Sequence, residues 1–168
     1  ILHKSDAGGV KLNLVGEAPL RDAFQAIQSN AQAYDPNAQI EGVLVTPMAE
    51  KGVEVIIGML RDPIFGPVLM FGLGGIFVEV YQDVAFRVAP FTKAEARAMI
   101  RDVKGYAILA GARGQAPSDM DALAEALHNL SLFAAANKDT IASIDINPFA
   151  VMAKGKGALG LDALIEPL

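Results

Sequence analysis

Two side chains near the C-terminus, Asn147 and Asp162, have the types and spacing of a divalent-cation site. Residues 143–148 alternate apolar and polar, so Asp145 and Asn147 are expected on one face of a strand. A glycine-rich turn at 154–157 leads into a second strand that ends at Asp162, and hairpin pairing would bring Asn147 and Asp162 together. A carboxylate and an amide oxygen, completed by phosphate oxygens and water, suit Mg²⁺. Asp and Asn are also common at strand ends, and spacing alone favours that structural role.

A glycine-rich segment, residues 71–79, connects two segments of β-type sequence. Its glycines, Gly72, Gly74 and Gly75, suit either close approach of the backbone to a ligand or positive φ in a turn. The spacing differs from dinucleotide-binding and Walker motifs, and a strand rather than a helix is expected to follow. An ordinary strand-to-strand turn is the alternative.

Two carboxylates, Glu54 and Glu79, lie within apolar segments. Each either faces solvent or points into a cleft, where burial is unfavourable without a partner. Val55 and Ile57 flank the strand on the face of Glu54 and make that face partly apolar, so a cleft orientation competes with the solvent-facing one.

Hydrophobic periodicity predicts the elements that position these groups. Helices are expected at 18–34, 92–103, where Thr92 and Glu95 form a capping box, and 118–136. Strands are expected at 10–14, 42–48, 53–61, 67–71, 76–80, 84–89, 140–147, 149–152 and 158–161. Strands, then helices, then strands indicate an α+β fold, with helices on one face of a mainly antiparallel sheet. A single domain over residues 1–168 is expected.

Composition narrows the function classes. The 168 residues are 52% hydrophobic, which excludes general disorder. A formal net charge of −5 argues against nucleic acid as a partner, and no apolar run is long enough to suggest a membrane span. The absence of cysteine removes thiol catalysis and Cys-ligated zinc and is compatible with a cytoplasmic location.

Seven motifs, taken in order, resemble one family over essentially the whole chain. They are His3-Lys4-Ser5-Asp6-x-Gly8-Gly9-Val10, Gly52-x-Glu54-x-Ile56-Ile57-Gly58, Asp62-x-x-Phe65-Gly66-Pro67-Val68, Gly72-x-Gly74-Gly75, Arg113-Gly114, Asp145-x-Asn147-Pro148 and Asp162. The series is similar to the ATP-grasp domain of the nucleoside-diphosphate-forming acyl-CoA synthetases, such as ADP-forming acetate–CoA ligase. The β subunit of succinyl-CoA synthetase is a more distant relative.

The resemblance implies ATP or ADP and Mg²⁺ as cofactors. Asn147 and Asp162 match the pair that binds Mg²⁺ on the nucleotide phosphates. Glu54 matches the glutamate that holds the ribose hydroxyls. Val45 and Met48 match a hinge whose backbone reads the adenine edge.

The resemblance also implies catalytic roles for two residues. Glu79 and the glycines of 72–75 match the part of the cleft that faces the phosphates and a phosphohistidine of the partner. His3 matches a loop histidine proposed to relay a phosphoryl group, and imidazole is a suitable nucleophile for that step. An exposed terminal histidine without a role is the alternative.

The implied reaction is acyl-CoA + ADP + phosphate to acid + CoA + ATP, through acyl phosphate and phosphohistidine. A complete enzyme of this family needs three further parts: a preceding half-domain with a strand lysine, a CoA-binding domain and a phosphohistidine domain, on the same chain or a partner subunit. The domain is therefore expected to be N-terminally incomplete, and the chain alone to bind nucleotide weakly and be inactive. A regulatory module of a protein lysine acetyltransferase is the first alternative. The second is a structural module with a decayed site, which acidic groups on apolar strands argue against.

Overall fold

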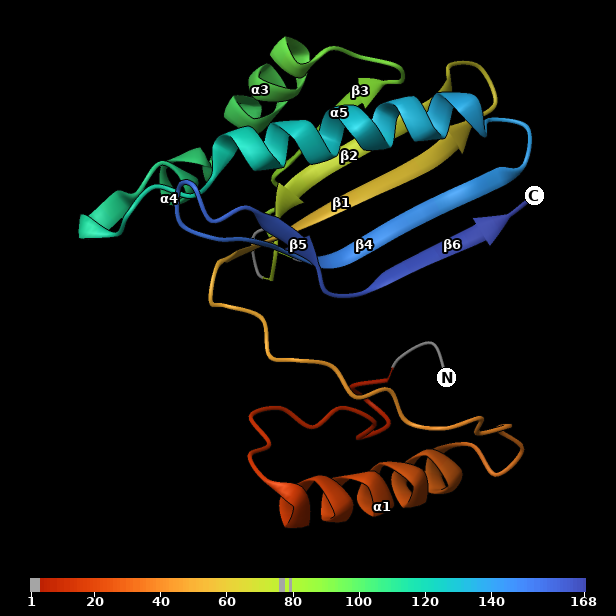
Figure 1. Ribbon diagram of the computed structural model, residues 1–168. Coiled ribbons are helices and arrows are strands. Elements are labelled where there is room, and N and C mark those ends of the chain that lie inside the picture. The colour runs from red at the N-terminus through yellow and green to blue at the C-terminus, as the bar shows by residue number, and fades with distance from the viewer. Residues whose placement is uncertain (1–3, 76–77, 79) are drawn as a thin grey trace. The chain divides into compact units, whose positions relative to one another are not determined.

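The computed structural model describes residues 4–75, 78 and 80–168, apart from the side chain of Arg113 (Figure 1). His3, Glu79 and most of the strand expected at 76–80 lie outside the described residues. The chain forms two compact units that divide after Met48.

The first unit contains one helix, α1 (Glu17–Tyr34), among its described residues. The helix predicted at 18–34 is thus confirmed, and it ends at Asp35, whose N–H donates to Ala31 O at 3.0 Å. The strands predicted at 10–14 and 42–48 are wrong, because neither segment pairs in a ladder, and Asn13 bends the first segment with a φ of 59°. A strand requires a neighbour for its backbone groups, and the described part of this unit offers none.

The second unit is built on an antiparallel sheet covered on one face by helices. Its strands are β1 (Val53–Asp62), β2 (Gly66–Leu73), β3 (Val84–Val88), β4 (Ile141–Val151), β5 (Ala158–Gly160) and β6 (Ala163–Pro167). The order is β3-β2-β1-β4-β5, and β6 also pairs with β4. Helices α3 (Lys93–Asp102) and α5 (Met120–Ala136) lie on one face, as Figure 1 shows. The α+β prediction is confirmed.

Alternation along the strands decides which side chains enter the core. Val55, Ile57 and Met59 of β1 are at most 3% exposed and pack beneath the helices, whereas Glu54 and Leu60 face the other way. Buried apolar area is the main stabilising term for such a layer. The same buried cluster includes Leu69, Phe71, Met99, Leu123, Leu127, Ile144 and Phe149.

The connections between β3 and β4 follow the predicted helix starts. Thr92 and Glu95 form the expected capping box at the start of α3. Asp119 caps α5 by accepting the N–H of Ala122 at 3.1 Å, close to the predicted start at 118. Between them lie a short helix, α4 (Tyr106–Leu109), and a 3-10 turn at Ala112–Gly114.

The C-terminal strands differ from prediction in two ways. The segments 140–147 and 149–152 form one strand, β4, rather than two, because an irregularity in the ladder accommodates Pro148. A further strand, β6, follows β5 and was not expected.

Candidate functional site

Of the described candidate residues of the second unit, Glu54 and Asn147 lie on the sheet face that α3 and α5 leave uncovered, here termed the open face, and Asp162 is hydrogen-bonded to Asn147. Glu54 is exposed there near the start of β1 and is paired with Ala150 of β4. Val55 and Ile57 do not share its face, as sequence analysis had assumed, because successive strand residues alternate. Glu54 is therefore exposed within the second unit, and its role stays a prediction.

A bulge in β4 shapes this face. Val55 pairs with Phe149 and Ile57 with Ile146, so the single residue Ile56 is opposed by both Asn147 and Pro148. A proline lacks the N–H that a regular ladder would require, and a bulge accommodates it. The extra residue keeps Ile146 and Phe149 both on the core side and leaves Asn147 exposed beside Asp145.

Asn147 and Asp162 are brought together as the hairpin argument predicted. The Asn147 N–H donates to Asp162 O at 3.1 Å, and the Leu161 N–H donates to Pro148 O at 2.9 Å. β5 pairs with the second half of β4 and β6 with the first half, so Asp162 lies at the junction between them. Strands on both sides therefore hold the backbone of the pair, while its metal-binding role stays a prediction.

Asp145 adds a second carboxylate to this region. Burial raises the pKa of Asp145, and the negative charge of Asp162 raises that pKa further. Two carboxylates that disfavour each other's ionisation create a local preference for a cation. The alternation of residues 143–148 predicts Asp145 on the face of Asn147, but it assigns Asp145 no role.

The donor set fits Mg²⁺ bound together with a nucleotide. Carboxylate and amide oxygens are hard ligands, and Mg²⁺ typically takes one or two protein carboxylates and completes its shell with phosphates and water. In the described ranges, His, Cys, Asp and Glu nowhere form a group of three or more that could hold a metal alone. A cation at Asn147 and Asp162 would thus draw its other ligands from substrate and solvent.

The glycines of the β2 end each have a packing or backbone reason. A Cβ on Gly74 would lie 3.1 Å from Glu54 O, and the Gly74 N–H donates to that oxygen at 2.9 Å. A Cβ on Gly72 would lie 2.9 Å from Val78 Cγ2, and Gly75 has a φ of +63°. The glycine loop is therefore fastened to the backbone of Glu54, whatever ligand it approaches.

The first unit carries the remaining described candidates. Val45 and Met48 lie in extended chain and are 61% and 56% exposed. The turn that follows His3 is closed by the Gly9 N–H donating to Lys4 O at 2.8 Å and is joined to α1 by Asn30 Nδ2 donating to Gly8 O at 3.1 Å. The roles of His3 and Glu79 stay predictions.

Both the sequence and the fold of this chain match known proteins. Residues 1–166 match the ATP-grasp domain family. The chain belongs to that family. The resemblance found in the sequence is thus confirmed, and the fold is that of its solved relatives.

Three relatives illustrate the match. The β subunit of ADP-forming acetate–CoA ligase II from Pyrococcus furiosus is 49% identical over 165 residues, which cover 98% of this chain and 70% of that subunit. ADP-forming acetate–CoA ligase I from Archaeoglobus fulgidus is 50% identical over 92% of this chain, but only 22% of that longer protein is covered. A solved structure of an acetyl-coenzyme A synthetase from Ca. Korarchaeum cryptofilum superposes with a TM-score of 0.84 at 44% identity, covering 99% of this chain and 71% of that one. That structure is a complex with coenzyme A and Mg-AMPPCP, and its phosphohistidine segment points towards the nucleotide binding site.

No helix in the described part of the chain combines the length and apolarity needed to cross a membrane.

Proposed function

We propose that this chain is the nucleotide- and Mg²⁺-binding part of an ADP-forming acyl-CoA synthetase. The observation that carries the proposal is the pairing of Asn147 with Asp162, next to Asp145, on the open face of an ATP-grasp sheet. The complete enzyme would convert acyl-CoA, ADP and phosphate to the acid, CoA and ATP.

Within this proposal, the protein's own residues bind and orient the nucleotide. Asn147 and Asp162 hold Mg²⁺, which when bound neutralises phosphate charge. Glu54 accepts hydrogen bonds from the ribose hydroxyls, as its exposed position near the start of β1 allows. Transfer of a phosphoryl group depends mainly on positioning and on neutralising charge, so a site of oxygen ligands and close backbone suits it.

Four further roles inferred from the family belong to the same proposal. Val45 and Met48 flank the adenine, His3 relays the phosphoryl group, and Glu79 faces the phosphohistidine. The loop of Gly72, Gly74 and Gly75 lies along the phosphates.

Partners and location complete the proposal. One relative is a separate β subunit, and another is a much longer single chain. CoA-binding and phosphohistidine domains would accordingly be supplied by the same polypeptide or by a partner subunit, in the cytoplasm.

The test is the Mg²⁺ dependence of ATP formation in the complete enzyme, that is, this chain together with those domains. Asp162→Asn should raise the Mg²⁺ concentration for half-maximal rate by about tenfold, since a charged ligand to the metal is lost. The exposed Asp139→Asn removes the same charge on the turn before β4 and serves as control. An unchanged Mg²⁺ dependence in Asp162→Asn would contradict the assignment.

A further inference from the structure

The turn between β4 and β5 is fastened to the start of α5 by one buried carboxylate. Asp119 is 8% exposed. Its Oδ2 accepts the backbone N–H groups of Gly155 and Gly157, each at 2.9 Å. Its Oδ1 accepts the N–H of Ala122 at 3.1 Å and so caps the helix. One side chain thus links two elements that are distant in sequence.

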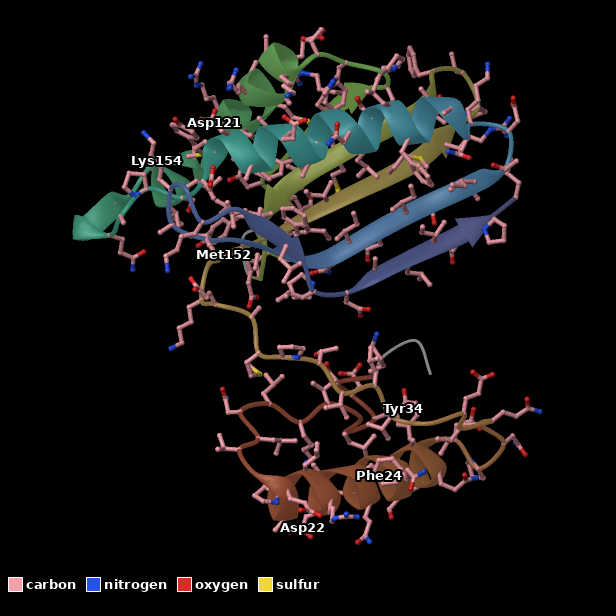
Figure 2. The ribbon with its side chains drawn as sticks, in the orientation of Figure 1. Asp22, Phe24, Tyr34, Asp121, Met152 and Lys154 are labelled. Carbon is pink, nitrogen blue, oxygen red and sulfur yellow. The ribbon has the colours of Figure 1, made fainter. Side chains whose placement is uncertain are left out.

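Backbone contacts reinforce the same junction. The Asp119 N–H donates to Met152 O at 2.8 Å, and the Lys154 N–H donates to Pro117 O at 2.9 Å. Figure 2 shows Met152 and Lys154 at this turn, with Asp121 of the first turn of α5 nearby. The hydrogen bonds from Ala122 and Gly157 hold the pKa of Asp119 below its usual value, so the carboxylate is ionised under ordinary conditions.

The turn matters because β5 is short. It forms only three residue pairs with β4, the last joining Phe149 to Gly160. Asp162 follows this strand after one intervening residue, Leu161. The position of β5 along β4, together with the pairing of Ala163 of β6 with Ile146, therefore decides which residue opposes Asn147. A slip of β5 by one position would turn its side chains to the other face.

We propose that Asp119 is a positioning residue for the metal pair. By accepting the N–H groups of Gly155 and Gly157, it fixes where β5 begins along β4 and so holds Asp162 opposite Asn147. It makes no contact with the metal. This inference rests on the proposed function, because it takes Asn147 and Asp162 as the ligands.

One substitution separates the two roles of Asp119. Asp119→Ser keeps a good N-cap for α5, since a serine hydroxyl reaches the same helix N–H groups, but it is too short to reach the glycines of the turn. We expect the Mg²⁺ concentration for half-maximal ATP formation by the complete enzyme to rise about tenfold, as for other residues that orient metal ligands. Thr92→Ala is the control, because it removes the N-cap of a different helix, α3. It should lower the melting temperature without changing the Mg²⁺ concentration for half-maximal ATP formation.

A double substitution provides a readout that general destabilisation would not give. If Asp119 acts only through Asp162, adding Asp119→Ser to Asp162→Asn should shift the Mg²⁺ dependence no further. Hydrogen exchange across residues 152–162 should also be faster in Asp119→Ser than in the wild type. Asp119→Asn keeps one acceptor oxygen, so its exchange rate should lie between those of the wild type and Asp119→Ser. These results would support the inference.

The two possible failures are distinguishable. If Asp162→Asn shifts the Mg²⁺ dependence but Asp119→Ser and Asp119→Asn leave it unchanged, the positioning role is wrong and the metal site stands. Additive shifts in the double variant would overturn the positioning role as well. If Asp162→Asn has no effect, the metal site is itself wrong, and this inference is lost with it.

Discussion

Asn147 and Asp162 are joined through their main chains, with the Asn147 N–H donating to Asp162 O at 3.1 Å. The contact lies where a bulge in β4 meets the junction of β5 and β6. Side chains carried by paired backbone have little freedom to separate, which suits a two-ligand site that must meet a nucleotide at fixed spacing. The spacing of the two proposed ligands is thus set by sheet register rather than by side-chain flexibility.

Glu54→Gln should weaken nucleotide binding through the ribose. Loss of a charged acceptor for two hydroxyls is worth about 1.5 kcal/mol, or roughly tenfold in Kd. The informative measurement is calorimetry of the complete enzyme with ATP and with 2′,3′-dideoxy-ATP. Wild type should discriminate between them and Glu54→Gln should not. Equal discrimination by both proteins would show that Glu54 does not contact the ribose.

Gly74→Ala should disturb the site by steric pressure on Glu54. The added Cβ would lie 3.1 Å from Glu54 O, so the start of β1 must move or strain by about 1 kcal/mol. Gly58→Ala, on β1, is a control, because its Cβ would meet Met70 Cε at an ordinary 3.5 Å. We expect nucleotide affinity to fall in the first variant only. A similar loss in both would point to a general effect on the sheet.

Asp145→Asn should stabilise the metal-free protein near neutral pH. Burial and Asp162 raise the folded-state pKa of Asp145 above 3.8, so its ionised form disfavours the folded state at higher pH. That penalty disappears as the pH falls through the folded pKa towards 3.8. We expect a gain of less than about 1 kcal/mol at pH 7, because solvent screens the charge, and none below pH 3.8. The test is to compare the melting temperatures of Asp145→Asn and the wild type at pH 7 and below pH 3.8. A difference between the two proteins that does not change with pH would contradict the prediction.

Asp83→Ala should destabilise the second unit. Asp83 is 6% exposed and accepts the N–H groups of Lys104 and Gly105, each at 2.8 Å. Leaving two donors unpaired should lower the free energy of unfolding by about 2–4 kcal/mol. Asp102→Asn, which removes a surface ion pair with Arg87, should lower it by less than about 1 kcal/mol.

The measurement is urea denaturation, combined with hydrogen exchange at the Lys104 and Gly105 amides. Exchange at these two amides should accelerate in Asp83→Ala and stay slow in Asp102→Asn. Equal losses of stability in the two variants would indicate that the buried carboxylate is not the anchor of this segment.

Local signals were sufficient where a segment's own residues decide its structure. The capping box at Thr92 sets the start of α3, and alternation identifies β1 and the shared face of Asp145 and Asn147. The glycine-rich turn at 154–157 correctly placed Asp162 beside Asn147. Each of these features follows from periodicity or capping within a few residues.

The missed features depend on partners that are distant in sequence. Residues 10–14 and 42–48 have strand-like composition, but composition does not reveal whether a neighbouring strand is present. β6 was missed because its five residues show no distinctive pattern and are exposed. Asp119 anchors the turn that contains Gly155, although the two residues are 36 positions apart in the sequence. No local sequence pattern indicates this contact.

The junction of β5 and β6 also protects the edge of the sheet against self-association. An outer strand offers unpaired backbone groups on which a second molecule can add its own strand, the first step towards aggregation. Here the outer row is split into strands of three and five residues by Leu161 and the charged Asp162. The interruption that presents a carboxylate to the open face thus also leaves no long, flat template along this side of the sheet.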